Sequence, residues 1–205
     1  MKRYGDVEDK TSIKDRKKAA IAVLMAAALL FICMTGCKGF YKEKAFLSAI
    51  LMNVSVNKEQ MKDLETDLKN DYLGDPDAGC IECARCDGLD NLQRTVNIRI
   101  VARDMDFLVA DLTAKQLFPS KPEEESPYEN LEELLPEELW ELVEPQVIYS
   151  DSPFRDKEPI AVYVGNTKLN GALKMSNGGS FLYVFRNAPH IDEVISLLTY
   201  LFTEE

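Results

Sequence analysis

The feature that most constrains this chain is an uninterrupted apolar segment close to its start. The segment runs for sixteen residues from Ala19 to Met34. Four basic residues stand just before it: Lys14, Arg16, Lys17 and Lys18. A basic flank, a short apolar core and small residues after the core form the pattern of an export signal. Because basic residues concentrate on the cytoplasmic side of a membrane segment, residues 1–18 are predicted to be a cytoplasmic leader.

The end of this segment, Met-Thr-Gly-Cys over Met34 to Cys37, resembles the lipobox of bacterial lipoproteins. In that family the residue before the cysteine is small so that a peptidase can cleave there, and the cysteine then carries the lipid. The resemblance implies that residues 19–36 are a signal peptide and that Cys37 is the lipidated first residue of the mature protein.

The alternative is that residues 19–36 remain in place as a transmembrane helix. Nineteen uncharged residues lie between Lys18 and Lys38, which is enough to span a bilayer. Both interpretations anchor the chain to the cell membrane and place the residues after Cys37 on the extracytoplasmic side.

The exported part of the chain is strongly acidic. The first 36 of the 205 residues hold seven Lys or Arg and four Asp or Glu, so the remainder holds 17 basic and 31 acidic side chains, a net charge of −14. Phosphate backbones repel such a surface, which argues against nucleic-acid binding. Pro122 to Glu144 alone contains ten Glu and no Lys or Arg. This stretch suits a solvated helix face, with a docking surface for a basic partner as the alternative.

After a tether over residues 37–45, residues 46–205 are predicted to form one α/β domain. Short apolar or alternating runs indicate strands, and apolar residues recurring every three or four positions indicate helices. The expected strands are 46–56, 95–101, 107–110, 146–149, 160–164 and 181–185. We expect a single three-layer domain with a mostly parallel or mixed sheet.

Three helices are expected in this domain. Asn57 can cap a helix whose apolar side runs to Tyr72, and Pro136 suits the first position of a short helix. Residues 191–202 form the clearest helical pattern, with acidic residues in the first turn. Residues 74–92 are predicted to be an exposed loop, because Gly, Pro and Asp cluster at its beginning.

The second half of the chain resembles type 2 periplasmic solute-binding proteins. The resemblance covers about residues 94–205 and is carried by five stretches: Asp106–Asp111, Ala114–Phe118, Leu131–Leu135, Ile160–Gly165 and Asn187–Glu205. Proteins of that family are longer and have two lobes around a ligand cleft. The resemblance therefore implies a reduced, one-lobe relative that binds a ligand, without catalytic activity and without a cofactor, alone or beside a transporter.

Three cysteines at equal spacing form the one local pattern with reactive potential: Cys80, Cys83 and Cys86. Thiolates are good ligands for soft metals, but a tetrahedral site needs a fourth ligand and the sequence supplies none nearby. Outside the cytoplasm a disulfide with one thiol left over is the default. A disulfide, plain thiols, a metal site and a thiol-redox function all remain open on this basis.

Other candidate patterns favour structural roles. Asp71, Asp75 and Asp77 lack the spacing of an EF-hand and suit an ordinary acidic turn. His190 is the only histidine and is expected to be a capping or surface residue. The sequence thus predicts a membrane-anchored binding protein of unknown ligand. A thiol-redox or metal-handling protein and a structural or assembly partner are the alternatives.

The lipid anchor can be tested directly. We expect intact-mass analysis of the mature protein to find Cys37 as its first residue, carrying lipid chains, since several chains hold a protein at a membrane where one holds it only marginally. If the leader is still attached and Cys37→Ser does not change membrane retention, residues 19–36 are a transmembrane helix instead.

Overall fold

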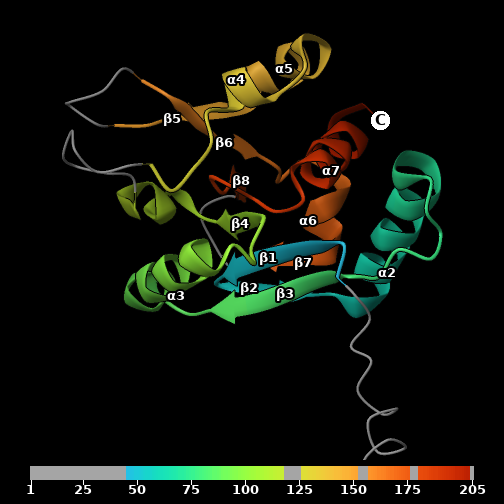
Figure 1. The fold of residues 1–205 in the computed structure, drawn as a ribbon, viewed down its shortest axis with the longest axis horizontal. Helices are drawn as coiled ribbons and strands as arrows, with labels where there is room; N and C mark the ends of the chain where they lie inside the picture. Colours follow the sequence, from blue (N-terminus) through green and yellow to red (C-terminus); the bar gives the residue numbers. More distant parts are fainter. Residues whose placement is uncertain (1–44, 118–125, 152–156, 176–179, 204–205) are drawn as a thin grey trace, which may run out of the picture. The chain divides into compact units, whose positions relative to one another are not determined.

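The computed structural model describes residues 45–117, 126–151, 157–175 and 180–203. They form a six-stranded mixed sheet in the order β3-β1-β4-β8-β6-β5 (Figure 1). The strands are β1 (Leu47–Met52), β3 (Ile81–Cys86), β4 (Phe107–Ala110), β5 (Val147–Tyr149), β6 (Pro159–Tyr163) and β8 (Phe181–Val184). The predicted α/β class with a mixed sheet is therefore confirmed. The predicted leader, the segment 19–36 and most of the tether lie outside the described residues.

β1 is the strand around which the sheet is organised. It pairs in parallel with both β3 and β4, whereas β4–β8, β8–β6 and β6–β5 are antiparallel. The predicted single strand over 46–56 is in fact two strands, because Asn53 has a φ of 55° and ends β1. After this residue, β2 (Val54–Val56) pairs with β7 (Leu173–Met175) in a separate two-stranded sheet. Asn is among the few residues that adopt a positive φ readily.

The helix predicted after Asn57 is confirmed. The Asn57 side chain accepts a hydrogen bond from the N–H of Glu59 at 3.2 Å and donates one to Gln60 at 2.7 Å. The first bond satisfies a backbone N–H that a helix start otherwise leaves unpaired, and the second joins the two side chains. α2 (Lys58–Asp67) continues as a π-helical turn, η2 (Leu68–Leu73), which ends at Gly74 with a φ of 63°.

Residues 74–102 differ from the prediction. The expected loop over 74–92 contains β3, and the expected strand over 95–101 is part of α3 (Leu89–Ala102). Leu92, Val96 and Ile100 recur at helical spacing and face the core, but Ile98 is 62 % exposed. The alternation of Val96, Ile98 and Ile100 thus resembled a strand, and packing of the helix against the sheet overrode the preference of Val and Ile for strands.

Helices cover both faces of the sheet. One face carries α2, α4 (Leu131–Leu134), α5 (Glu137–Val143), α6 (Lys168–Ala172) and α7 (Ile191–Thr203). The opposite face carries α3 and the 3-10 helix η3 (Leu112–Leu117). α7 buries one side, formed by Val194, Leu197, Leu198 and Leu201, so the predicted C-terminal helix is confirmed. No helix among the residues that the structure describes is long and apolar enough to cross a membrane.

Candidate functional site

A pocket of about 390 Å³ lies at the amino end of β1 and beside the start of α7. Its wall combines apolar and acidic side chains with the imidazole of His190. The lining residues are Ala45, Phe46, Leu73, Asp75, Asp77, Ala78, Gly79, His190 and Glu193. Its volume is within the range of small-molecule sites, and its wall is more polar than is usual for them.

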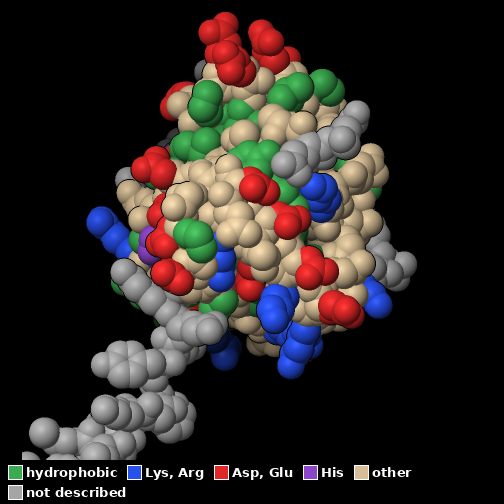
Figure 2. Space-filling view, turned by 90° about the vertical axis from the view of Figure 1, so that its right-hand side faces the viewer, with side chains coloured by type: hydrophobic (Ala, Val, Ile, Leu, Met, Phe, Trp, Pro, Cys, Tyr) green, Lys and Arg blue, Asp and Glu red, His purple; other side chains and the backbone are tan. Residues whose placement is uncertain are grey.

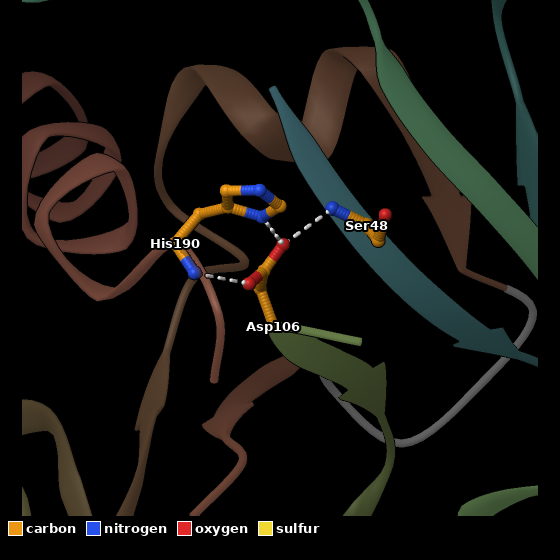
Figure 3. Close-up of polar contacts among 3 residues, drawn as sticks. All are labelled: Ser48, Asp106 and His190. Atoms are coloured by element: carbon orange, nitrogen blue, oxygen red, sulfur yellow. Dashed lines mark hydrogen bonds and ion pairs between the residues drawn. The ribbon is translucent and has the colours of Figure 1, made fainter. Parts of the chain in front are cut away.

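His190 is held in this wall by Asp106, a carboxylate with no exposed surface (Figure 3). The backbone N–H of His190 donates to Oδ1 of Asp106 at 2.9 Å. Nδ1 of His190 lies 3.1 Å from Oδ2 of Asp106, and the backbone N–H of Ser48 donates to the same oxygen at 2.7 Å. Burial of a carboxylate is costly unless hydrogen bonds compensate. Here two backbone donors and one ring nitrogen provide that compensation.

The geometry selects one tautomer of the imidazole. A carboxylate accepts hydrogen bonds and does not donate them, so the contact with Asp106 requires a proton on Nδ1. The neutral ring of His190 then carries its lone pair on Nε2. Its side chain is 35 % exposed, so the neutral form of the ring has an acceptor, Nε2, that is not used by Asp106.

The acidic side of the pocket is built by a tight turn after η2. The Asp75 side chain accepts from the N–H of Asp77 at 3.1 Å, and its carbonyl accepts from the N–H of Ala78 at 3.0 Å. Glu193, in the first turn of α7, supplies a third carboxylate. No group of three or more metal-ligating side chains is placed to hold an ion within the described ranges. The wall of the pocket therefore combines three carboxylates with the imidazole of His190.

Sequence reasoning found the parts of this pocket but not their proximity. The acidic turn at Asp75 and Asp77 was predicted as structural, and His190 as a surface or capping residue. The residue that joins His190 to the sheet, Asp106, was noted only as the boundary of a strand. The one signal pointing to it was an aspartate directly before the apolar run 107–110.

Cys83 and Cys86 do not converge. Cys83 and Cys86 are in β3, where residues three apart point to opposite faces. Cys83 packs against the core that contains α2 and α7, and Cys86 is buried in the core beneath α3. Residues three apart in an extended strand are separated by about 10 Å, whereas the Cα atoms of a disulfide lie within about 7 Å.

The structure joins none of Cys80, Cys83 and Cys86 in a disulfide, and plain thiols were among the alternatives that the sequence left open. Burial, followed by the negative charge of Glu65, raises the pKa of Cys83 from 9.0 to about 12. Burial also raises the pKa of Cys86. Thiolates are the reactive and metal-binding form, so this environment disfavours both chemistries. Cys37 lies outside the described residues.

Comparison with known proteins yields no match: no family model, curated protein or solved structure is significantly similar to this chain. The fold and the pocket therefore carry the functional argument by themselves.

Asp106 is expected to be essential for stability. An Asn side chain has one acceptor oxygen for the three donors that Asp106 serves, so Asp106→Asn should lower the free energy of unfolding by about 1–3 kcal/mol. Urea denaturation measures this difference. Asp63→Asn, on the exposed side of α2, is the matched control with the same charge change. Equal stability of the two variants would contradict the role given to Asp106.

Cys83 is expected to react slowly. With its pKa raised from 9.0 to about 12, the thiolate fraction at pH 8 falls about a thousandfold, and alkylation by iodoacetamide slows in proportion. Peptide mapping by mass spectrometry follows each cysteine separately, with the urea-unfolded chain as reference. Modification of Cys83 at the same rate in the folded and unfolded chain would refute the buried environment.

Proposed function

We propose that this protein is a membrane-anchored, extracytoplasmic binding protein whose domain captures a small organic cation in the His190 pocket and does not catalyse a reaction. The pocket is the single observation that carries the proposal. The anchor and the side of the membrane rest on the sequence of residues 1–45. A domain anchored on the extracytoplasmic side of the membrane meets its ligand outside the cytoplasm and delivers it to a partner protein or signals its presence.

The chemistry of the pocket favours a positively charged ligand with an apolar part. Asp75, Asp77 and Glu193 supply negative charge, and Phe46 and Leu73 supply apolar surface. The acceptor of His190 matches an N–H or O–H donor of the ligand. The net charge of −14 beyond residue 36 raises the local concentration of cations around the domain.

Binding is favoured over nucleophilic catalysis by what surrounds His190. A histidine held by a buried carboxylate is also part of hydrolytic triads, but such a triad needs a hydroxyl or thiol beside the imidazole. Within the described residues, the lining of this pocket includes no Ser, Thr or Cys. The imidazole is therefore better suited to hold a ligand than to activate a nucleophile.

We further propose that the domain is a reduced, one-lobe relative of the type 2 solute-binding proteins. The order of elements supports this kinship: β4 is bounded by Asp106 and Asp111 and is followed by the short helix η3. A transporter in the same membrane is then a natural partner. The thiol-redox or metal-handling alternative is less favoured, because Cys83 and Cys86 point to opposite faces of β3. Burial also raises the pKa of both thiols and so keeps them protonated.

Calorimetric titration of the full chain in lipid nanodiscs tests this function. The probes are putrescine, choline and arginine, with succinate as an anionic comparison and empty nanodiscs as the blank. We expect at least one amine to bind, and succinate not to bind. The double variant Asp75→Asn/Asp77→Asn should weaken amine binding at least tenfold, because charged hydrogen bonds contribute about 1.5–3 kcal/mol each and 1.4 kcal/mol is a factor of ten.

The matched control is Glu59→Gln/Asp63→Asn, which removes the same charge from the exposed side of α2 outside the pocket. This control should bind the amine as the unmodified chain does. Equal weakening in both double variants, binding of succinate, or no heat with any amine would refute the assignment of the pocket.

A further inference from the structure

A second, larger hollow lies away from the His190 pocket. It is a groove of about 910 Å³, open to solvent, between α5, the edge strand β5 and the end of α7. Polar and apolar groups share its wall about equally, and the apolar part comes from Leu142, Val147, Ile148, Leu201 and Phe202 among others. The lining residues are Leu142, Pro145, Gln146, Val147, Ile148, Tyr163, Asn166, Thr167, Lys168, Leu201 and Phe202. Its volume is at the upper end of the range for ligand pockets, which suits several side chains of a protein segment.

The groove exposes apolar surface that the fold does not use. Leu142 is 47 % exposed although its neighbours on α5, Leu139 and Val143, are buried. Phe202 and Leu201, at the end of α7, face the same groove. Exposed apolar side chains that gather in one hollow, with polar residues around them, are a mark of interaction sites.

The strand beside the groove has an open edge. β5 is the last strand of the sheet and pairs only with β6, so no strand among the described residues meets its outer side. Unpaired N–H and C=O groups along such an edge can bind an extended chain, and pockets beside the edge then select its side chains. An extended segment can therefore use both the edge and the groove.

The segment that supplies Leu142 to the groove is acidic. α4, α5 and the turn after them carry six exposed glutamates: Glu132, Glu133, Glu137, Glu138, Glu141 and Glu144. Glu138 lies one helical turn before Leu142 and on the same side of α5. Figure 2 shows acidic side chains gathered at the top of the molecule with hydrophobic side chains below them. The one cation of the lining, Lys168, lies 4.6 Å from the ring centroid of Tyr200, so it is engaged with that ring.

We propose that this groove binds an extended apolar segment of a partner protein, flanked by Lys or Arg. The apolar centre of the segment fills the groove beside Leu142 and Phe202, its backbone pairs with β5, and its basic flanks face the glutamates of α5. This surface is distinct from the His190 pocket and does not depend on a ligand there. It gives the acidic stretch 122–144 a role beyond solvation.

Binding of three labelled peptides to the full chain in nanodiscs of zwitterionic lipid tests the proposal. The peptides are a Leu/Val-rich centre with lysine flanks, the same centre with glutamate flanks, and a Ser/Gly-rich centre with lysine flanks. Fluorescence anisotropy, with empty nanodiscs subtracted, should show binding of the first peptide only, because both burial and charge are required. Equal binding of either other peptide, or no binding of the first, overturns the proposal.

Matched variants locate the contact. Leu142→Asp and the double variant Glu138→Lys/Glu141→Lys should each weaken binding of the first peptide at least tenfold. Leu112→Asp is the control, since Leu112 is 46 % exposed on η3 and does not line the groove. It should leave binding unchanged, and the groove variants should leave amine binding at His190 unchanged. Loss of peptide binding in Leu112→Asp, or its persistence in Leu142→Asp, refutes this assignment.

Discussion

The buried carboxylate of Asp106 holds together the parts of the chain on which both proposed sites depend. It stands directly before β4 and accepts hydrogen bonds from Ser48 in β1 and from His190 before α7, which are 58 and 84 residues away. The backbone of Asp106 also bonds to Ser48 and Phe185. A carboxylate without exposed surface is tolerated only where such donors converge. Asp106 therefore ties the start of α7 to β1 and β4, while the buried side of the helix packs in the core.

α7 in turn links the two hollows. Its first turn supplies Glu193 to the His190 pocket, and its last turn supplies Leu201 and Phe202 to the groove. The side between them is buried in the core through Val194, Leu197 and Leu198. A helix of thirteen residues is about 20 Å long, so the pocket and the groove are separate surfaces that share one rigid support.

The elements that were predicted correctly have strong local signals. Asn57 and Gln60 indicate a helix start through local hydrogen bonds alone. In α7, apolar residues recur every three or four positions and form one side of the helix. β3 and α3 lacked such signals. β3 is a short parallel edge strand whose sequence mixes Cys, Glu, Ala and Arg. In α3, the exposed Ile98 produced the alternating apolar pattern that is typical of a strand. Packing against the sheet decided both, because β-propensity depends on the surroundings of each residue.

The sequence by itself determined the acidic charge of the domain, its α/β class and the caps and apolar sides of its main helices. These properties follow from composition and from contacts between residues a few positions apart. Only the tertiary structure decided that Asp106 holds His190, that Cys83 and Cys86 face opposite sides of β3, and that Leu142 meets Phe202 around a groove. Such contacts join residues that are far apart in the chain or depend on strand register. A local pattern does not encode these contacts. They form only when the whole core packs, because burial of apolar surface must offset the conformational entropy that the chain loses on folding.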